Sequence, residues 1–182
     1  VRGSAALLDR VELRLLLLQS GVLIATQGYG ADGVGAVYER ALALAQKLGD
    51  TSALHKLRLG LEGWHFMRGD FPRAQAMVDE LTAALGPAPE SQARLQADWV
   101  RANLQFHQGR LHEAVALTDR CLADYGQGGS RASAVQDPGV MCLCYSSWAL
   151  WEMGRADEAL ARARQGVALA ERLKHPFSLG QA

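Results

Sequence analysis

Residues 28–33 (Gly-Tyr-Gly-Ala-Asp-Gly) have the GxGxxG spacing that holds a dinucleotide pyrophosphate, and an acidic residue, Asp50, follows about 20 residues later. This chemistry requires one strand before the glycines and a second strand that ends at the acidic residue. Residues 37–49, however, have the composition and spacing of a helix. We therefore interpret the glycines as a turn between two helices and expect neither a bound nicotinamide cofactor nor any other.

The other residues that could take part in catalysis or metal binding form no recognisable enzyme motif. The five histidines are not arranged as a metal-ligand motif, no GxxxxGK[ST] sequence is present, and the spacing defines no Ser-His-Asp set. The three cysteines (Cys121, Cys142 and Cys144) lack zinc-ligand spacing, and on a helix the last two point to different faces. We expect buried, reduced thiols, no metal site, no ATP hydrolysis and no enzymatic activity.

Composition and charge narrow the possible partners. The 182 residues are 49% apolar, and 19 basic residues balance 19 acidic ones, so no net charge attracts nucleic acid or an anionic membrane. The apolar run at 15–25 is too short to span a bilayer and lacks a signal-peptide cleavage region. We expect a cytoplasmic protein that contacts neither nucleic acid nor membrane. The first residue is Val1, and we expect a piece of a longer chain.

A repeated sequence pattern indicates how the helices of the chain are organised. Three glycines lie 40 and 45 residues apart, each with an aromatic residue three positions earlier and an alanine five positions later. A fixed period of this length is typical of stacked helical repeats. The three sets are Phe66, Gly69 and Ala74; Phe106, Gly109 and Ala114; and Trp151, Gly154 and Ala159. A more degenerate copy has Tyr29 at the glycine position and Val34 at the alanine position.

Apolar residues at spacings of three and four predict an all-α fold without strands. The expected helices cover residues 5–26, 34–48, 51–67, 72–85, 90–107, 111–125, 138–153 and 156–174. They form one domain, 1–182, with four helix pairs at about 5–48, 51–85, 90–125 and 138–174, and residues 175–182 begin a truncated further repeat. Residues 126–136 form a long Gly/Ser/Ala-rich connection, for which a mobile and a functional role both remain open.

The turns resemble those of the tetratricopeptide repeat, in the sequences GDFPRA (69–74), GRLHEA (109–114) and GRADEA (154–159). Residues 26–50 and 136–182 more specifically resemble the helical repeat region of large bacterial signalling ATPases of the AAA/STAND type. In that family a nucleotide-binding domain precedes the repeats, and a cyclase or a DNA-binding domain supplies the output. The resemblance implies a right-handed α-solenoid with a regulatory role, and it carries no nucleotide-binding or cyclase activity onto this chain.

The resemblance also implies which residues face a concave groove, namely those three, six and ten positions before each turn glycine. We expect a protein or peptide partner to contact Leu59, Phe66, Trp99, Asn103, Phe106, Trp148 and Trp151. Lys or Arg, which would clamp a peptide carboxylate, is absent from these positions, so an apolar segment or helix is the expected ligand. The alternative is that the same side chains are buried core between repeats.

Two functions follow from these observations. The chain is expected to be a regulatory interaction or sensor array of a larger cytosolic signalling ATPase or transcriptional regulator, whose upstream domains are candidate partners. The alternative is a free-standing tetratricopeptide-like adaptor that binds a peptide or a partner helix.

Overall fold

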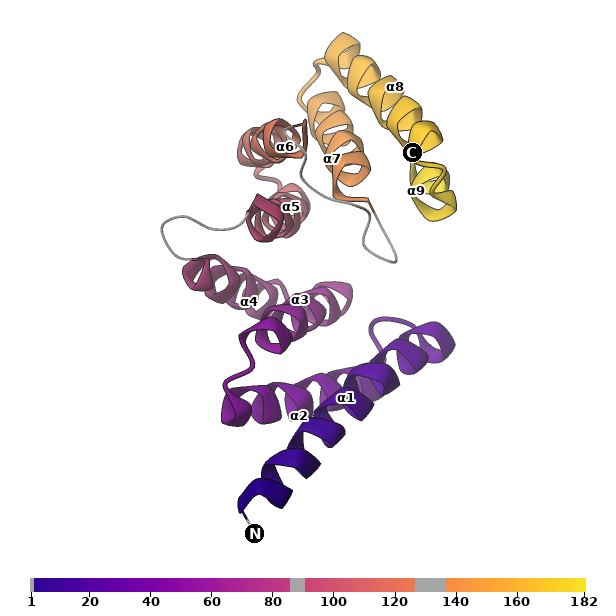
Figure 1. Cartoon of the computed structure of the whole chain (residues 1–182). Coiled ribbons are helices and arrows are strands. Elements are labelled where there is room, and N and C mark those ends of the chain that lie inside the picture. The colour runs from indigo at the N-terminus through magenta and orange to yellow at the C-terminus, as the bar shows by residue number, and fades with distance from the viewer. Residues whose placement is uncertain (1, 86–90, 127–136) are drawn as a thin grey trace. The chain divides into compact units, whose positions relative to one another are not determined.

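The computed structural model describes residues 2–85, 91–126 and 137–182, and within these ranges every regular element is a helix. The expected all-α class is therefore confirmed. The chain divides into two compact units, Val1–Ala84 and Leu85–Ala182. The first contains α1 (Arg2–Gln27), α2 (Asp32–Leu48), α3 (Thr51–Met67) and α4 (Phe71–Ala84) (Figure 1). The second contains α5 (Ser91–His107), α6 (Leu111–Gly126), α7 (Pro138–Glu152), α8 (Ala156–Leu173) and α9 (Pro176–Gln181).

The first eight helices match the sequence-based bounds to within three residues, because local signals determine their ends. Gly49 ends α2 in the left-handed conformation, at φ 65°. Asp50 then caps α3 by accepting a hydrogen bond from the Ala53 amide at 2.9 Å. Asp137 caps α7 in the same way, with Pro138 in the first turn. The connection expected at 126–136 lies, apart from Gly126, outside the described residues.

The three repeat turns have the same backbone geometry. Gly69, Gly109 and Gly154 have φ values of 73°, 75° and 77°, which residues with a side chain rarely adopt. In each turn the amide after the glycine donates to a carbonyl five residues earlier, at 2.9 Å. The alanine five positions after each glycine is buried. The sequence repeat thus corresponds to a structural repeat of the turn.

In the first unit, consecutive helices pack in pairs, α1 on α2, α2 on α3 and α3 on α4. Two glycines let α2 and α3 approach closely. Beside each glycine lies an aromatic ring of the other helix. A Cβ atom added at Gly60 would lie 2.5 Å from Cζ of Tyr38, and one added at Gly35 would lie 2.3 Å from Cζ2 of Trp64. The rings therefore occupy the space that side chains at these two positions would need.

We expect Gly60→Ala to lower the free energy of unfolding by about 1–2 kcal/mol, because the added methyl group must displace the Tyr38 ring. Gly63→Ala is the matched control in the same helix, since a Cβ there meets nothing within 4 Å. That variant should be neutral or more stable, because alanine favours helix more than glycine does. Urea denaturation measures both changes, and equal effects at the two positions would contradict the packing argument.

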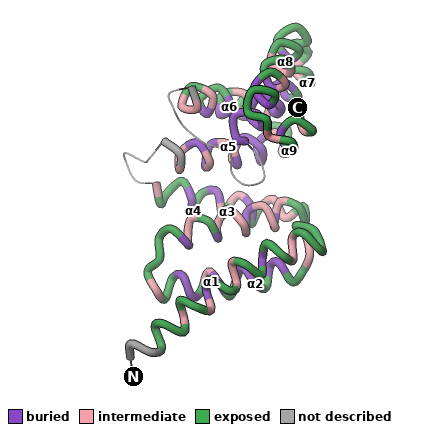
Figure 2. Tube along the Cα trace, turned by 45° about the vertical axis from the view of Figure 1, so that its right-hand side comes forward, coloured by how far each residue is buried: buried purple, intermediate pink, exposed green. Residues whose placement is uncertain are grey.

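In the second unit, α7 packs against α5, α6, α8 and α9 and is the most deeply buried helix (Figure 2). An ion pair joins α5 to α6, in which Arg120 donates from Nε and Nη2 to the Asp98 carboxylate at 2.7 and 2.6 Å. Asp98 itself is buried. These contacts hold α5, α6 and α7 in a fixed relative arrangement.

The three cysteines are buried, as expected. Cys142 packs with Cys121 and Leu95, whereas Cys144 packs with Leu143 and Leu169, so the two thiols of α7 do lie on different faces. Burial raises the pKa of the Cys144 thiol, which keeps that thiol protonated.

Candidate interaction surface

Aromatic side chains of α5 and α7 form a contiguous cluster in the second unit. The ring of Tyr145 lies at its centre, with centroids 5.4 Å from Trp99, 5.4 Å from Phe106, 5.7 Å from His107 and 4.8 Å from Trp148. Phe106 also contacts Trp148 directly at 6.1 Å. Two of these pairs, Tyr145 with Phe106 and Tyr145 with Trp148, meet edge to face, an arrangement that favours aromatic contact beyond the area buried.

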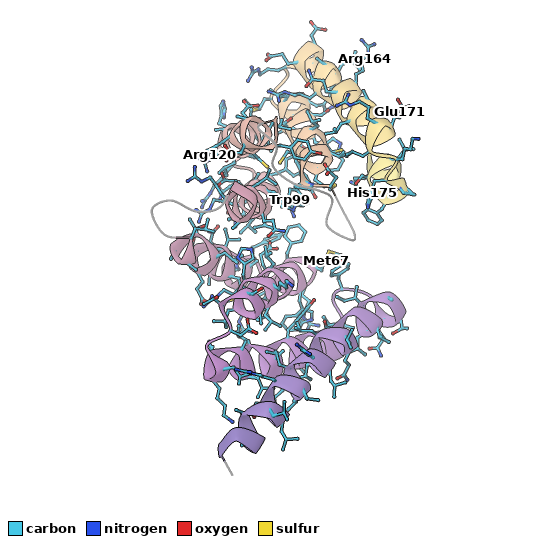
Figure 3. The ribbon with its side chains drawn as sticks, in the orientation of Figure 1. Met67, Trp99, Arg120, Arg164, Glu171 and His175 are labelled. Carbon is cyan, nitrogen blue, oxygen red and sulfur yellow. The ribbon has the colours of Figure 1, made fainter. Side chains whose placement is uncertain are left out.

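Helical spacing explains why α5 contributes its part of the cluster. Trp99, Asn103 and Phe106 follow one another at i, i+4 and i+7 and share a face of the helix. His107 is held by a hydrogen bond from its Nδ1 to the carbonyl of Asn103 at 2.9 Å. Since a carbonyl oxygen only accepts, the proton of this bond is on Nδ1. Trp99 is labelled on α5 in Figure 3.

Two tryptophans leave large apolar areas at the surface. Trp148 is 39% exposed and Trp151 67% exposed, while Trp99 and Phe106 are half-buried. The Trp148 ring therefore packs against Tyr145 and Phe106 of the cluster, and the rest of the side chain is exposed to solvent. Trp151, about one helical turn further along α7, is not part of the ring contacts found among the described residues.

Asn103 adds a polar group to this face of α5. The residue is buried, yet its Oδ1 atom has no hydrogen-bond partner among the described residues. A buried acceptor without a partner costs free energy. This atom is enclosed by the surrounding side chains, so it contributes no accessible polar group to the surface.

The other two predicted contact residues, Leu59 and Phe66, belong to α3 of the first unit. Both are half-buried. Phe66 lies against Phe71 at the start of α4, with ring centroids 5.8 Å apart. This contact joins α3 and α4 across the turn at Gly69.

Sequence reasoning missed Tyr145, the centre of the cluster. Counting ten positions back from Gly154 gives Cys144, whose side chain packs in the core with Val140 and Leu169 instead. Spacing did not choose between the two residues, because Tyr145 lies three positions and Cys144 four positions before Trp148, and both spacings share a helix face.

Gly28 and Gly30 lie in a turn between two helices, as interpreted from sequence, and Gly33 lies in the first turn of α2. Gly28 has φ 87° in the α1–α2 turn, and α1 rather than a strand precedes it. The end of α3 holds this turn: Trp64 Nε1 donates to the Ala31 carbonyl at 2.9 Å, and Arg68 donates to the Gly30 carbonyl at 3.0 Å. These contacts give the segment a structural role.

The residues that the structure describes include neither a metal-ligand cluster nor a membrane-spanning helix. Among them, no three His, Cys, Asp or Glu side chains are grouped so that they could hold a metal ion. Within the described helices, none is long and apolar enough to cross a membrane.

Comparison with known proteins identifies no protein family for this chain. No protein-family model matches the chain, and a sequence search of curated proteins returns no match.

Proposed function

We propose that the chain is a helical-repeat interaction module whose second unit binds an apolar segment of a protein partner through the aromatic residues of α5 and α7. The observation that carries the proposal is the exposure of Trp148 and Trp151 beside a packed aromatic cluster. Large apolar side chains grouped at the surface of a folded protein usually mark an interaction site. Tryptophan also contributes more than most residues to binding energy at interfaces.

The chemistry of the surface indicates the kind of segment that fits. The exposed rings of Trp148 and Trp151 offer wide apolar contact. The natural ligand is therefore an amphipathic helix or an extended peptide with bulky apolar side chains. The tetratricopeptide-like, right-handed stacking implied by the sequence resemblance is part of this proposal.

The resemblance of residues 26–50 and 136–182 supports a regulatory role within a larger bacterial signalling ATPase. In that setting the bound segment comes from an upstream domain of the same protein. A Walker-type nucleotide-binding motif encoded upstream in the same gene would support this role. A gene that encodes only helical repeats would favour the adaptor alternative instead.

The binding surface is testable with peptides selected from a phage-displayed library of random helical sequences. We expect Trp148→Ala combined with Trp151→Ala to weaken binding of the selected peptides by about 30-fold or more, since each side chain is expected to be an interface hot spot. Circular dichroism should show unchanged helix content. Fluorescence anisotropy with labelled peptides measures the affinity.

The matched control changes two exposed apolar residues of other helices, Leu160→Ala in α8 and Phe177→Ala in α9. Leu160 is 50% exposed and Phe177 52% exposed, so their solvent contact is similar to that of the two tryptophans. Peptide affinity should be unchanged in this control. Equal losses in both double variants, or no loss in the tryptophan variant, would contradict the proposed surface.

A further inference from the structure

Helix α1 carries a stripe of exposed aliphatic side chains along its length. The stripe consists of Leu8, Val11, Leu15, Leu18 and Val22, flanked by Leu7, and each of the six is between 46% and 69% exposed. The spacings along the stripe are three, four, three and four, and Ala25 continues the pattern. This 3-4 alternation is the a/d seam of a coiled coil, in which such residues pack into a facing helix.

The opposite face of α1 packs against the core of the first unit. Leu13 is buried and belongs to the core of the first unit, with Leu16, Leu17 and Leu23 packed against the same core. Two ion pairs also fasten α1 to α2, Lys47 to Asp9 at 2.7 Å and Arg40 to Glu12 at 2.8 Å. The helix is thus held in place by one apolar face while a second apolar face stays open to solvent (Figure 2).

The exposed area of this stripe is similar to the area that each partner buries in a stable protein interface. The six exposed fractions correspond to roughly 600–700 Å² of accessible residue surface per chain, against about 600–1,000 Å² per partner in standard specific interfaces. A helix of the same chain supplies an equal area.

The stripe is also complementary to itself when two copies run antiparallel. In that register Leu15 lies opposite Leu18 of the second copy, Val11 opposite Val22, and Leu8 opposite Ala25. Residues 15–27 contain no charged side chain, so the charged first half of one helix faces the uncharged second half of the other. A parallel pair would instead place each charged residue beside the identical residue of the second copy. It would also align the two helix dipoles unfavourably.

We propose that the chain forms a symmetric homodimer through antiparallel pairing of α1 from two copies. The interface is the exposed 3-4 stripe, and each copy contributes the same residues, as two-fold symmetry requires. The residues of this stripe are not those of the aromatic cluster of α5 and α7, and the proposal does not depend on partner binding there.

Sedimentation equilibrium of the full 182-residue chain tests the proposal. We expect a dimer, and we expect Leu15→Glu combined with Leu18→Glu to raise its dissociation constant by about 100-fold or more, because four carboxylates would then meet in the apolar seam. The control, Leu160→Glu with Phe177→Glu, makes the same kind of change at exposed sites on α8 and α9 and should leave the dimer intact. A monomeric wild-type chain at about 100 μM would overturn the proposal.

Cross-linking tests the orientation without adding charge and without disturbing the fold. Leu15→Cys and Leu18→Cys are made as separate variants, mixed, and oxidised with glutathione disulfide, which is reduced as the inter-chain disulfide forms. Antiparallel pairing predicts that the mixture cross-links faster than either variant by itself, since residues 15 and 18 lie opposite each other. Faster cross-linking of each variant with itself indicates a parallel pair, and no cross-linking in any sample indicates no pair. Either result overturns the proposed dimer.

Discussion

Replacing Asp137 with alanine is expected to lower the free energy of unfolding by about 3 kcal/mol, because a fully buried hydrogen-bonding centre is lost. One carboxylate oxygen accepts from the Val140 amide at 3.0 Å and so caps α7. The other accepts from the Tyr125 hydroxyl of α6 at 3.1 Å. Burial, followed by the charge of Asp137, raises the pKa of Tyr125, which keeps that hydroxyl protonated and able to donate. Alanine would leave the buried Val140 amide and the partly buried Tyr125 hydroxyl without this partner.

The backbone of Asp137 extends the same network to α9. Its amide donates to Ser178 Oγ at 3.0 Å, and Ser178 Oγ lies 2.9 Å from His175 Nδ1. Since the Ser178 amide also donates to that nitrogen, Nδ1 is the acceptor, and the Ser178 hydroxyl donates to it. One buried residue thus joins α6, α7 and α9.

The control for Asp137→Ala is Asp50→Ala. Asp50 also caps a helix, but it is exposed, and its substitution should cost only about 1 kcal/mol. Urea denaturation followed by circular dichroism measures both. Combining Asp137→Ala with Tyr125→Phe should cost less than the two single changes added together, because both remove the same hydrogen bond. Equal losses for Asp137→Ala and Asp50→Ala would contradict the role of burial.

Glu62→Gln is expected to raise the free energy of unfolding by about 3 kcal/mol at pH 8 and by less than about 1 kcal/mol at pH 5. Glu62 in α3 is only 4% exposed, and its Oε1 atom has no hydrogen-bond partner among the described residues. Burial therefore raises the pKa of this carboxyl from 4.5 to about 8. Glutamine keeps the shape of the side chain and removes the ionisation.

The sign of the pH dependence follows from proton binding. Between pH 4.5 and 8 the folded state keeps the Glu62 proton that the unfolded state releases, so this residue's contribution to stability falls as the pH rises through that window. His65 acts in the opposite direction, because burial lowers its pKa. The His65 contribution is present in both proteins and cancels when the variant is compared with wild type.

Urea denaturation of wild type, Glu62→Gln and an exposed control, Glu152→Gln, at pH 5 and pH 8 measures this difference. The control should behave as wild type at both pH values. A stabilisation by Glu62→Gln that is the same at pH 5 and pH 8 would show that ionisation of Glu62 is not its cause.

The sequence by itself determined where most helices begin and end. Gly49, Asp50 and the pair Asp137–Pro138 act within a few residues of their own position, through backbone conformation and amide capping. The repeated turn glycines act in the same local way, as their positive φ values show. Such signals need no knowledge of the neighbouring helices, and for this reason they could be read from the chain.

The tertiary structure alone decided which side chains come together. Helix α7 is apolar on nearly all sides, so its composition could not show whether Tyr145 or Cys144 faces α5. Gly60 is a closely packed position only because Tyr38 of another helix occupies the space beside it. Glu62 is buried although its type predicts exposure. Each of these outcomes depends on how one helix is rotated against its neighbour, and residues distant in the sequence determine that rotation.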